Sequence, residues 1–232
     1  VIPRQNPVMH KEWSQKIGTG YSGVSLIDNT AITMYSDHEF DYVIALNANN
    51  GEKRWQYKIG PTYKGHGNSQ DGPLSTPLIS AGHVFCLSPF GLFFALSLDS
   101  GELKWQFDLE REFNARAPRW GFTSSPLAYK DRVFVLAGGT DGASFILAFD
   151  AKEGNLLWQF GEDFAHYRSP VVGKINGADV LLAAGDENLY CVDPDSGELQ
   201  WTYAVDGGFT DGATPVVVAP NRLLVQTATH GL

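Results

Sequence analysis

Cysteine and positive charge are both scarce in this chain of 232 residues. The two cysteines, Cys86 and Cys191, form neither a Cys-Cys nor a Cys-x-x-Cys pair, and each lies in an apolar run where we expect a buried thiol. Lysine and arginine number 17 against 26 acidic residues, a formal net charge of −9 that repels nucleic-acid phosphates and anionic membrane surfaces. No apolar run approaches the roughly 20 residues of a membrane-spanning helix. The composition therefore argues against nucleic-acid binding, membrane spanning and metal sites built on paired cysteines.

A repeat of about 45 residues organises the chain. In four places a glycine precedes a tryptophan by four positions, and the steps between these glycines are 50, 53 and 43 residues. The pairs are Gly51 with Trp55, Gly101 with Trp105, Gly154 with Trp158, and Gly197 with Trp201. A second marker, Thr-Pro or Ser-Pro, recurs at steps of 49, 44 and 45 residues, at Pro77, Pro126, Pro170 and Pro215. Two markers with one period indicate a repeated supersecondary unit.

Each repeat is predicted to form four short strands. In the second repeat they fall near residues 77–79, 83–87, 92–96 and 103–107, and the middle two are continuous apolar runs. Continuous runs indicate burial on both faces of a sheet, whereas a sandwich buries only one. A propeller packs every blade between two neighbours. We therefore expect an all-β propeller of four-stranded antiparallel blades.

The repeated glycine and tryptophan have local physical explanations. The glycine lies in a hairpin turn, where it can take the positive φ that closes a short loop. The tryptophan ends each repeat on the outermost strand, and we expect its ring to dock against the adjacent blade.

The whole chain, residues 1–232, is expected to form one propeller domain. Trp13 lies 42 residues before Trp55 and marks the last strand of a preceding blade. The expected segments are 1–17 for that last strand, 18–59, 71–109, 121–162 and 167–205 for four complete blades, and 208–232 for the start of a fifth. The split fifth blade either closes a five-bladed ring or belongs to a larger one, and we expect a fragment of a larger ring because unpaired strand edges are otherwise left exposed.

Residues 148–158, Ala-Phe-Asp-Ala-Lys-Glu-Gly-Asn-Leu-Leu-Trp, closely resemble the repeat of the pyrroloquinoline-quinone-like β-propeller superfamily. The other repeats match with Asn47 and Ser97 in place of the aspartate and Cys191 in place of the alanine, so the resemblance covers essentially the whole chain. It implies an exported protein of the periplasm or cell envelope, usually with eight blades, although this segment itself shows no signal peptide.

The resemblance implies different functions in different branches of the superfamily. Quinoprotein alcohol and glucose dehydrogenases hold the quinone over the channel, with a vicinal disulfide and a calcium set, whereas the B subunit of the barrel-assembly machine binds partner polypeptide without a cofactor. This chain has no Cys-Cys pair and no evident calcium set. We therefore assign no catalytic residue, no metal ligand and no cofactor, and expect pyrroloquinoline quinone with calcium only under a dehydrogenase interpretation.

Two other motifs have ordinary structural explanations. Residues 18–23 match a dinucleotide-binding fingerprint by letters, but a strand rather than a helix follows them, which favours a simple loop. The six histidines lack metal-ligand spacing, and most fall in loops on one face of the propeller.

The long links between blades are the best candidates for binding. The link at 60–72 holds His66 and Asp71, and the link at 110–121 holds Arg116, Arg119 and Trp120. Long loops on a rigid scaffold often bind ligands, and arginine and tryptophan dominate interface energetics. The alternative is that Trp120 covers the blade beneath it while the arginines pair with Glu110 or Glu112. The corresponding residues of the next link are Tyr167 and Arg168.

The expected function is therefore that of a non-catalytic binding or scaffold propeller of the cell envelope. Its inter-blade links would contact a partner protein or a small-molecule or glycan ligand around the channel mouth. One alternative is a quinone-dependent alcohol or sugar dehydrogenase whose cofactor site lies largely outside this segment. Another is a carbohydrate-binding propeller, since loops rich in aromatic and polar residues also suit sugars.

Overall fold

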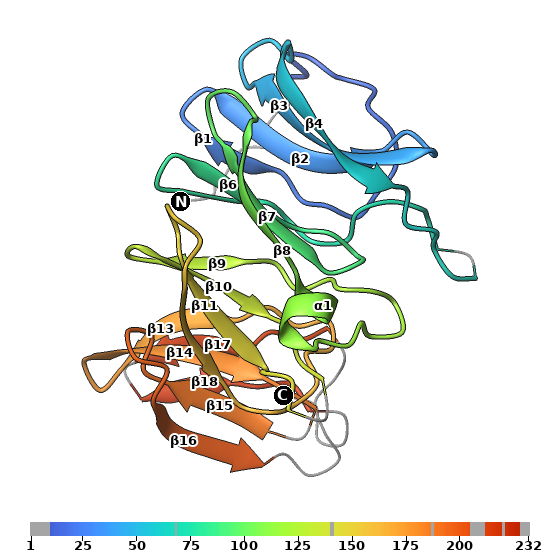
Figure 1. Cartoon of the computed structure of the whole chain (residues 1–232). Coiled ribbons are helices and arrows are strands. Elements are labelled where there is room, and N and C mark those ends of the chain that lie inside the picture. Colours follow the sequence, from blue (N-terminus) through green and yellow to red (C-terminus); the bar gives the residue numbers. More distant parts are fainter. Residues whose placement is uncertain are drawn as a thin grey trace.

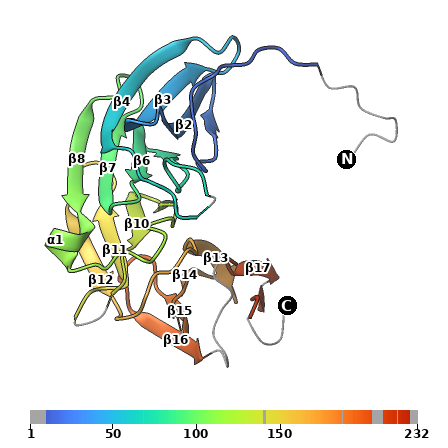
Figure 2. The same cartoon turned by 90° about the vertical axis from the view of Figure 1, so that its right-hand side faces the viewer.

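The computed structural model describes residues 10–67, 69–139, 142–186, 188–204, 212–219 and 221–227. These residues form four four-stranded antiparallel sheets, one two-stranded sheet and one short helix. The sheets succeed one another along the chain (Figure 1) and follow an open arc, with β13 and β17 on its inner side and β4, β8, β12 and β16 on its outer side (Figure 2). This arrangement confirms the expected all-β propeller class.

Every four-stranded sheet has the same order, in which each strand pairs with the next along the chain. The first sheet comprises β1 (Ser25–Ile27), β2 (Thr30–Ser36), β3 (Phe40–Asn47) and β4 (Lys53–Pro61). The second comprises β5 (Leu78–Ser80), β6 (His83–Leu87), β7 (Leu92–Ser97) and β8 (Leu103–Asp108). The third comprises β9 (Leu127–Tyr129), β10 (Arg132–Leu136), β11 (Ile146–Asp150) and β12 (Leu156–Phe160). The fourth comprises β13 (Val171–Ile175), β14 (Ala178–Ala184), β15 (Asn188–Val192) and β16 (Leu199–Ala204), and the last pair is β17 (Val216–Ala219) with β18 (Arg222–Leu224).

The middle strands of each sheet are buried on both faces, as their continuous apolar sequences indicate. Phe85 and Phe93 of the second sheet pack against Val133 and Phe149 of the third, while Cys86 on the opposite face packs against the first sheet. Equivalent clusters join the third sheet to the fourth and the fourth to the two-stranded sheet. Buried apolar layers therefore alternate with sheets along the whole arc.

The sheets are also joined by a repeated contact between a tryptophan ring and a glycine of the following sheet. A Cβ on Gly101 would lie 2.6 Å from the Trp55 ring, and Trp55 Nε1 donates a hydrogen bond to Leu98 O at 2.8 Å. Trp13 makes the same hydrogen bond to Ala48 O at 2.8 Å. The ring–glycine pairs are Trp13 with Gly51, Trp55 with Gly101, Trp105 with Gly154 and Trp158 with Gly197. The glycine thus serves both the turn and the close approach of a ring.

The two ends of this series differ from the rest. Residues 10–17, the described part of the expected strand at 1–17, form no strand. Trp13 and Ile17 instead cover Tyr35, Ile44 and Leu46 on the face of the first sheet that points away from the second sheet. At the other end, Trp201 packs with the cluster that joins the fourth sheet to β17 and β18. Residues 1–9, 205–211 and 228–232 lie outside the described residues, and they include parts of the expected segments 1–17, 167–205 and 208–232.

The helix α1 (Leu109–Phe113) directly follows β8 and forms the beginning of the second link. The Asp108 carboxylate accepts a hydrogen bond from Arg111 N at 3.2 Å, and Leu109 is buried against the second and third sheets. In the part of the chain described here, no helix is long and apolar enough to cross a membrane.

Replacing a turn glycine with alanine should separate backbone strain from loss of the tryptophan contact. Gly101 has φ +72° with the Trp55 ring against it, whereas Gly82 has φ +75° with nothing within 4 Å of an added Cβ. We expect Gly82→Ala to lower the free energy of unfolding by about 1–2 kcal/mol, the cost of left-handed backbone. Gly101→Ala should cost a further ~1–3 kcal/mol because the ring must move. Urea unfolding measures the loss of free energy of unfolding in each variant. Equal losses would contradict a stabilising close contact between the Trp55 ring and Gly101.

Candidate functional site

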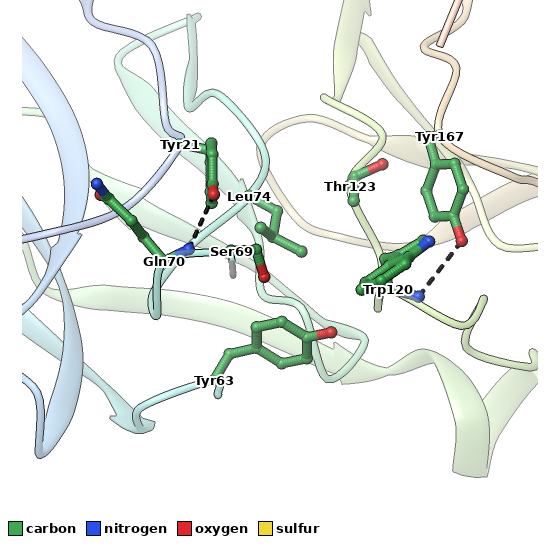
Figure 3. A pocket seen from close by; sticks show the side chains of 8 residues that line it. All are labelled: Tyr21, Tyr63, Ser69, Gln70, Leu74, Trp120, Thr123 and Tyr167. Carbon is green, nitrogen blue, oxygen red and sulfur yellow. Dashed lines mark hydrogen bonds between the residues drawn. The ribbon is translucent and has the colours of Figure 1, made fainter. Parts of the chain in front are cut away.

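The links from β4 to β5, β8 to β9 and β12 to β13 converge on one face of the arc and enclose an aromatic cavity of about 310 Å³ (Figure 3). Four of the eight lining side chains are aromatic and none is acidic or basic. The lining residues are Tyr21, Tyr63, Ser69, Gln70, Leu74, Trp120, Thr123 and Tyr167. The cavity is therefore a neutral site built from segments that lie far apart in the sequence.

Tyr63 forms the floor of this aromatic cavity. Its side chain is only 8 % exposed, and its ring meets the Phe90 ring edge-on with centroids 5.5 Å apart. Its backbone N donates a hydrogen bond to Asp41 Oδ2 at 3.2 Å, which ties the first link to β3. The Tyr63 hydroxyl has no hydrogen-bond partner among the described residues, and neither does the buried hydroxyl of Thr123.

The other side of the cavity is held by contacts between the first link and the segment before β1. Gln70 N donates to the Tyr21 hydroxyl at 2.9 Å, as Figure 3 shows, and Tyr21 N donates to Pro73 O at 2.8 Å. Asp71 does not line the cavity. Its carboxylate accepts hydrogen bonds from Lys64 Nζ at 2.9 Å and Gly65 N at 3.0 Å, and the Lys64 contact holds the pKa of Asp71 below its usual range. Asp71 therefore shapes the link that carries Ser69 and Gln70.

Trp120 projects from the second link and remains 37 % exposed. Its backbone N donates to the Tyr167 hydroxyl at 3.3 Å, so the second and third links support each other. The His66 ring meets the Trp120 ring edge-on at 5.2 Å between centroids, and the Arg119 guanidinium lies 5.1 Å from the ring centroid. The structure therefore brings His66, Arg119, Trp120 and Tyr167 together at the edge of the aromatic cavity.

A second cavity of about 410 Å³ adjoins the first, and Tyr167 borders both. It is lined by Arg116, Ala117, Pro118, Arg119, Phe164, His166 and Tyr167, and we call it the arginine cavity. His166 Nε2 lies 2.9 Å from Asp186 Oδ1. The aromatic cavity and the arginine cavity together make a continuous surface with one neutral and one cationic compartment.

The arginines of the second link do not pair with Glu110 or Glu112. Glu110 Oε1 accepts a hydrogen bond from Ala117 N at 3.2 Å and Glu112 Oε1 accepts one from Asp108 N at 2.8 Å, so both acids serve the local backbone. Among the ion pairs of the described residues, Arg116 and Arg119 take part in none. Both side chains are exposed and available to a ligand.

Arg168 differs from the other residues singled out in the links. Its side chain is 1 % exposed, and its guanidinium donates hydrogen bonds to Ala184 O at 3.1 Å and to Gly185 O. A guanidinium enclosed by backbone carbonyls joins the third link to β14 and cannot touch a partner at the surface. We therefore leave Arg168 out of the candidate site.

Asp41 lies buried beneath the first link and is not among the residues predicted for the site. Burial raises the pKa of its carboxyl from the usual 3.8 to about 6, although the hydrogen bond from Tyr63 N opposes the shift. A lone acid inside the apolar run of β3 was the available signal. No local sequence signal marks Tyr21, Leu74 or Thr123, because these residues reach the aromatic cavity only through tertiary packing.

The described residues offer no metal centre. No three histidine, cysteine, aspartate or glutamate side chains among them come together as a metal-binding group. Cys86 and Cys191 are free and buried in the second and fourth sheets, far apart along the arc.

A protein-family model described as outer membrane protein assembly factor BamB matches residues 39–230 of this chain. The chain belongs to this family. The match covers every described strand from β3 onward, and so includes all three links that build the two cavities.

Proteins similar to this chain include quinone-linked oxidoreductases. A 1-butanol dehydrogenase (quinone) from Thauera butanivorans is 27 % identical over 161 residues, which are 63 % of this chain and 24 % of that protein. A europium-containing methanol dehydrogenase has a TM-score of 0.59 and 16 % identity, over 83 % of this chain and 43 % of the other. Quinohemoprotein alcohol dehydrogenase ADHIIG from Pseudomonas putida HK5 has a TM-score of 0.56 and 16 % identity, over 79 % and 34 %.

This chain therefore spans 24 % of the curated relative and less than half of either solved structure. Structural likeness at 16 % identity shows a shared fold and leaves the activity to be argued from the site.

Asp41 should make stability depend on pH. Because its pKa is about 6 in the folded protein and 3.8 when exposed, folding binds a proton between these values. The destabilisation that comes from burying the ionised Asp41 carboxylate is absent below about pH 3.8, grows as the pH rises and is complete above about pH 6. We expect Asp41→Asn to stabilise the protein more at pH 7 than at pH 4. The change that it causes in the free energy of unfolding should be more favourable at pH 7 by about 1–3 kcal/mol. Urea titrations of both proteins from pH 4 to pH 7 measure this, and parallel curves would contradict it.

Proposed function

We propose that this protein is a non-catalytic binding propeller of the cell envelope, whose working surface is the face formed by the three inter-blade links. The observation that carries the proposal is Trp120, a large ring left 37 % exposed in the lining of the aromatic cavity and next to Arg119 of the arginine cavity. Exposed aromatic and arginine side chains beside a preformed cavity are typical of binding surfaces. Membership of the BamB family supports the envelope location and a binding role.

The rigid sheets explain why loops can hold such a surface. Each link is anchored at its base: Asp41 of β3 accepts a hydrogen bond from the first link, Glu110 bonds within the second, and Arg168 ties the third to β14. Anchored loops lose little conformational entropy when a ligand binds. The site is therefore preorganised by residues that do not themselves touch the ligand.

A quinone-dependent dehydrogenase is the second function that we consider, because the oxidoreductases named above share the fold. The described residues do not supply the features that such a cofactor site needs. Cys86 and Cys191 lie in different sheets and cannot form a vicinal disulfide, and the described acidic residues form no metal-binding group. We therefore derive no catalytic step through a quinone.

The test of the proposed function compares variants at the face with one on a distant strand. Trp120→Ala should weaken binding of a ligand selected from a displayed peptide library or a panel of neutral sugars at least tenfold, and Arg119→Ala about threefold to tenfold, because both side chains are exposed beside the cavities. The control Tyr203→Ala removes an aromatic ring that is 63 % exposed on β16 and should leave affinity unchanged. Calorimetric titration of each purified variant gives the affinities.

Two outcomes would contradict the proposal. The first is unchanged affinity in Trp120→Ala and Arg119→Ala with normal folding by circular dichroism. The second is turnover: the protein mixed with pyrroloquinoline quinone and calcium would reduce a dye in the presence of 1-butanol, which a non-catalytic propeller does not do.

A further inference from the structure

The aromatic cavity has the chemistry of a site for a neutral, hydroxyl-rich ring. Its eight lining residues carry aromatic rings, hydroxyls, one amide and one leucine, and no acidic or basic group. An ionised ligand would find no counter-charge there, so its burial would be costly. At about 310 Å³ the cavity lies at the small end of the range for ligand sites, which suits one or two small rings.

Two buried hydroxyls in this lining lack hydrogen-bond partners. Tyr63 is more than nine-tenths buried, and its hydroxyl points into the space between Ser69 and Trp120 (Figure 3). The hydroxyl of Thr123, from the second link, is also buried and unpartnered. A buried hydroxyl without a partner costs about 1–3 kcal/mol, so an occupant that supplies donors and acceptors on more than one side recovers that energy.

The aromatic rings of the lining favour an occupant that has an apolar face as well as hydrogen-bonding groups. Tyr21 is 53 % exposed and Trp120 is 37 % exposed at the cavity mouth, and Figure 3 shows them on opposite sides of it. The C–H faces of a sugar ring pack on aromatic rings while its hydroxyls point outward round the edge. Ser69 places a further neutral hydroxyl at that edge (Figure 3).

We propose that the aromatic cavity binds a neutral saccharide ring, with Trp120 as the stacking platform and Tyr63 and Thr123 as hydrogen-bonding groups. The proposal rests on the proposed function, because it names the ligand of the same face. An apolar peptide side chain would fill the cavity but leave both hydroxyls unpartnered. A carboxylate ligand would suit the arginine cavity and not this one.

The experiment is a saturation-transfer NMR screen of the whole chain against maltose, cellobiose, lactose and N,N′-diacetylchitobiose, followed by calorimetric titration. We expect at least one of these neutral sugars to bind. Trp120→Ala should weaken its affinity at least tenfold and Tyr63→Phe threefold to tenfold, because Tyr63→Phe removes only the unpartnered hydroxyl. The matched control Tyr203→Ala should bind as the wild type does, and thermal unfolding confirms that each variant is folded.

Each outcome decides the proposal. Sugar binding that is lost in Trp120→Ala and weakened in Tyr63→Phe supports it. Binding that is equal in all variants places the sugar elsewhere and overturns it. If no sugar in the panel binds, the proposal is also overturned, and a displayed peptide library then tests the proposed function separately: peptide binding that depends on Trp120 would keep that function and assign a protein partner.

Discussion

The contact between a tryptophan ring and the turn glycine of the following sheet is the constraint on which the rest of the structure depends. An added Cβ on any of these four glycines would lie 2.6 Å from a ring atom, so the turn and the stacking of sheets require the same small residue. The ring also fixes the spacing of adjacent sheets at their outer edges, while the phenylalanine and valine side chains of the middle strands fill the layer between them. The same local contact recurs at all three junctions between successive four-stranded sheets.

The position of the candidate site follows from this geometry. A chain that leaves the outer strand of one sheet must cross the sheet to reach the inner strand of the next, so the three links pass over the same face. Tyr63, Trp120 and Tyr167 come from three different links and meet because the sheets are held side by side. The cavity therefore depends on the scaffold for its shape and on the links for its chemistry, which allows links to change without a change of fold.

The fold could be predicted from the sequence, whereas only part of the site could. Apolar middle strands and a period near 45 residues reflect local requirements that repeat four times, so each repeat reinforces the others. The contact between Tyr21 and Gln70 occurs once and joins residues 49 positions apart, and nothing in either local sequence indicates it. Arg168 shows the opposite difficulty: an arginine in a link looks like a surface group, but carbonyls of β14 and the residue after it enclose this one. Residues 10–17 resemble the end of a repeat, yet a strand needs a neighbour and Trp13 can dock without one.

A double-mutant cycle between Trp55 and Gly101 tests the contact between the tryptophan ring and the turn glycine most directly. We expect Gly101→Ala in a Trp55→Ala background to cost only the backbone strain of about 1–2 kcal/mol, because the ring that the new methyl group would meet is gone. The coupling energy between the two substitutions would then be at least about 1 kcal/mol by urea unfolding. A cost for Gly101→Ala that is the same with and without the Trp55 ring would contradict the claim that this contact holds successive sheets together.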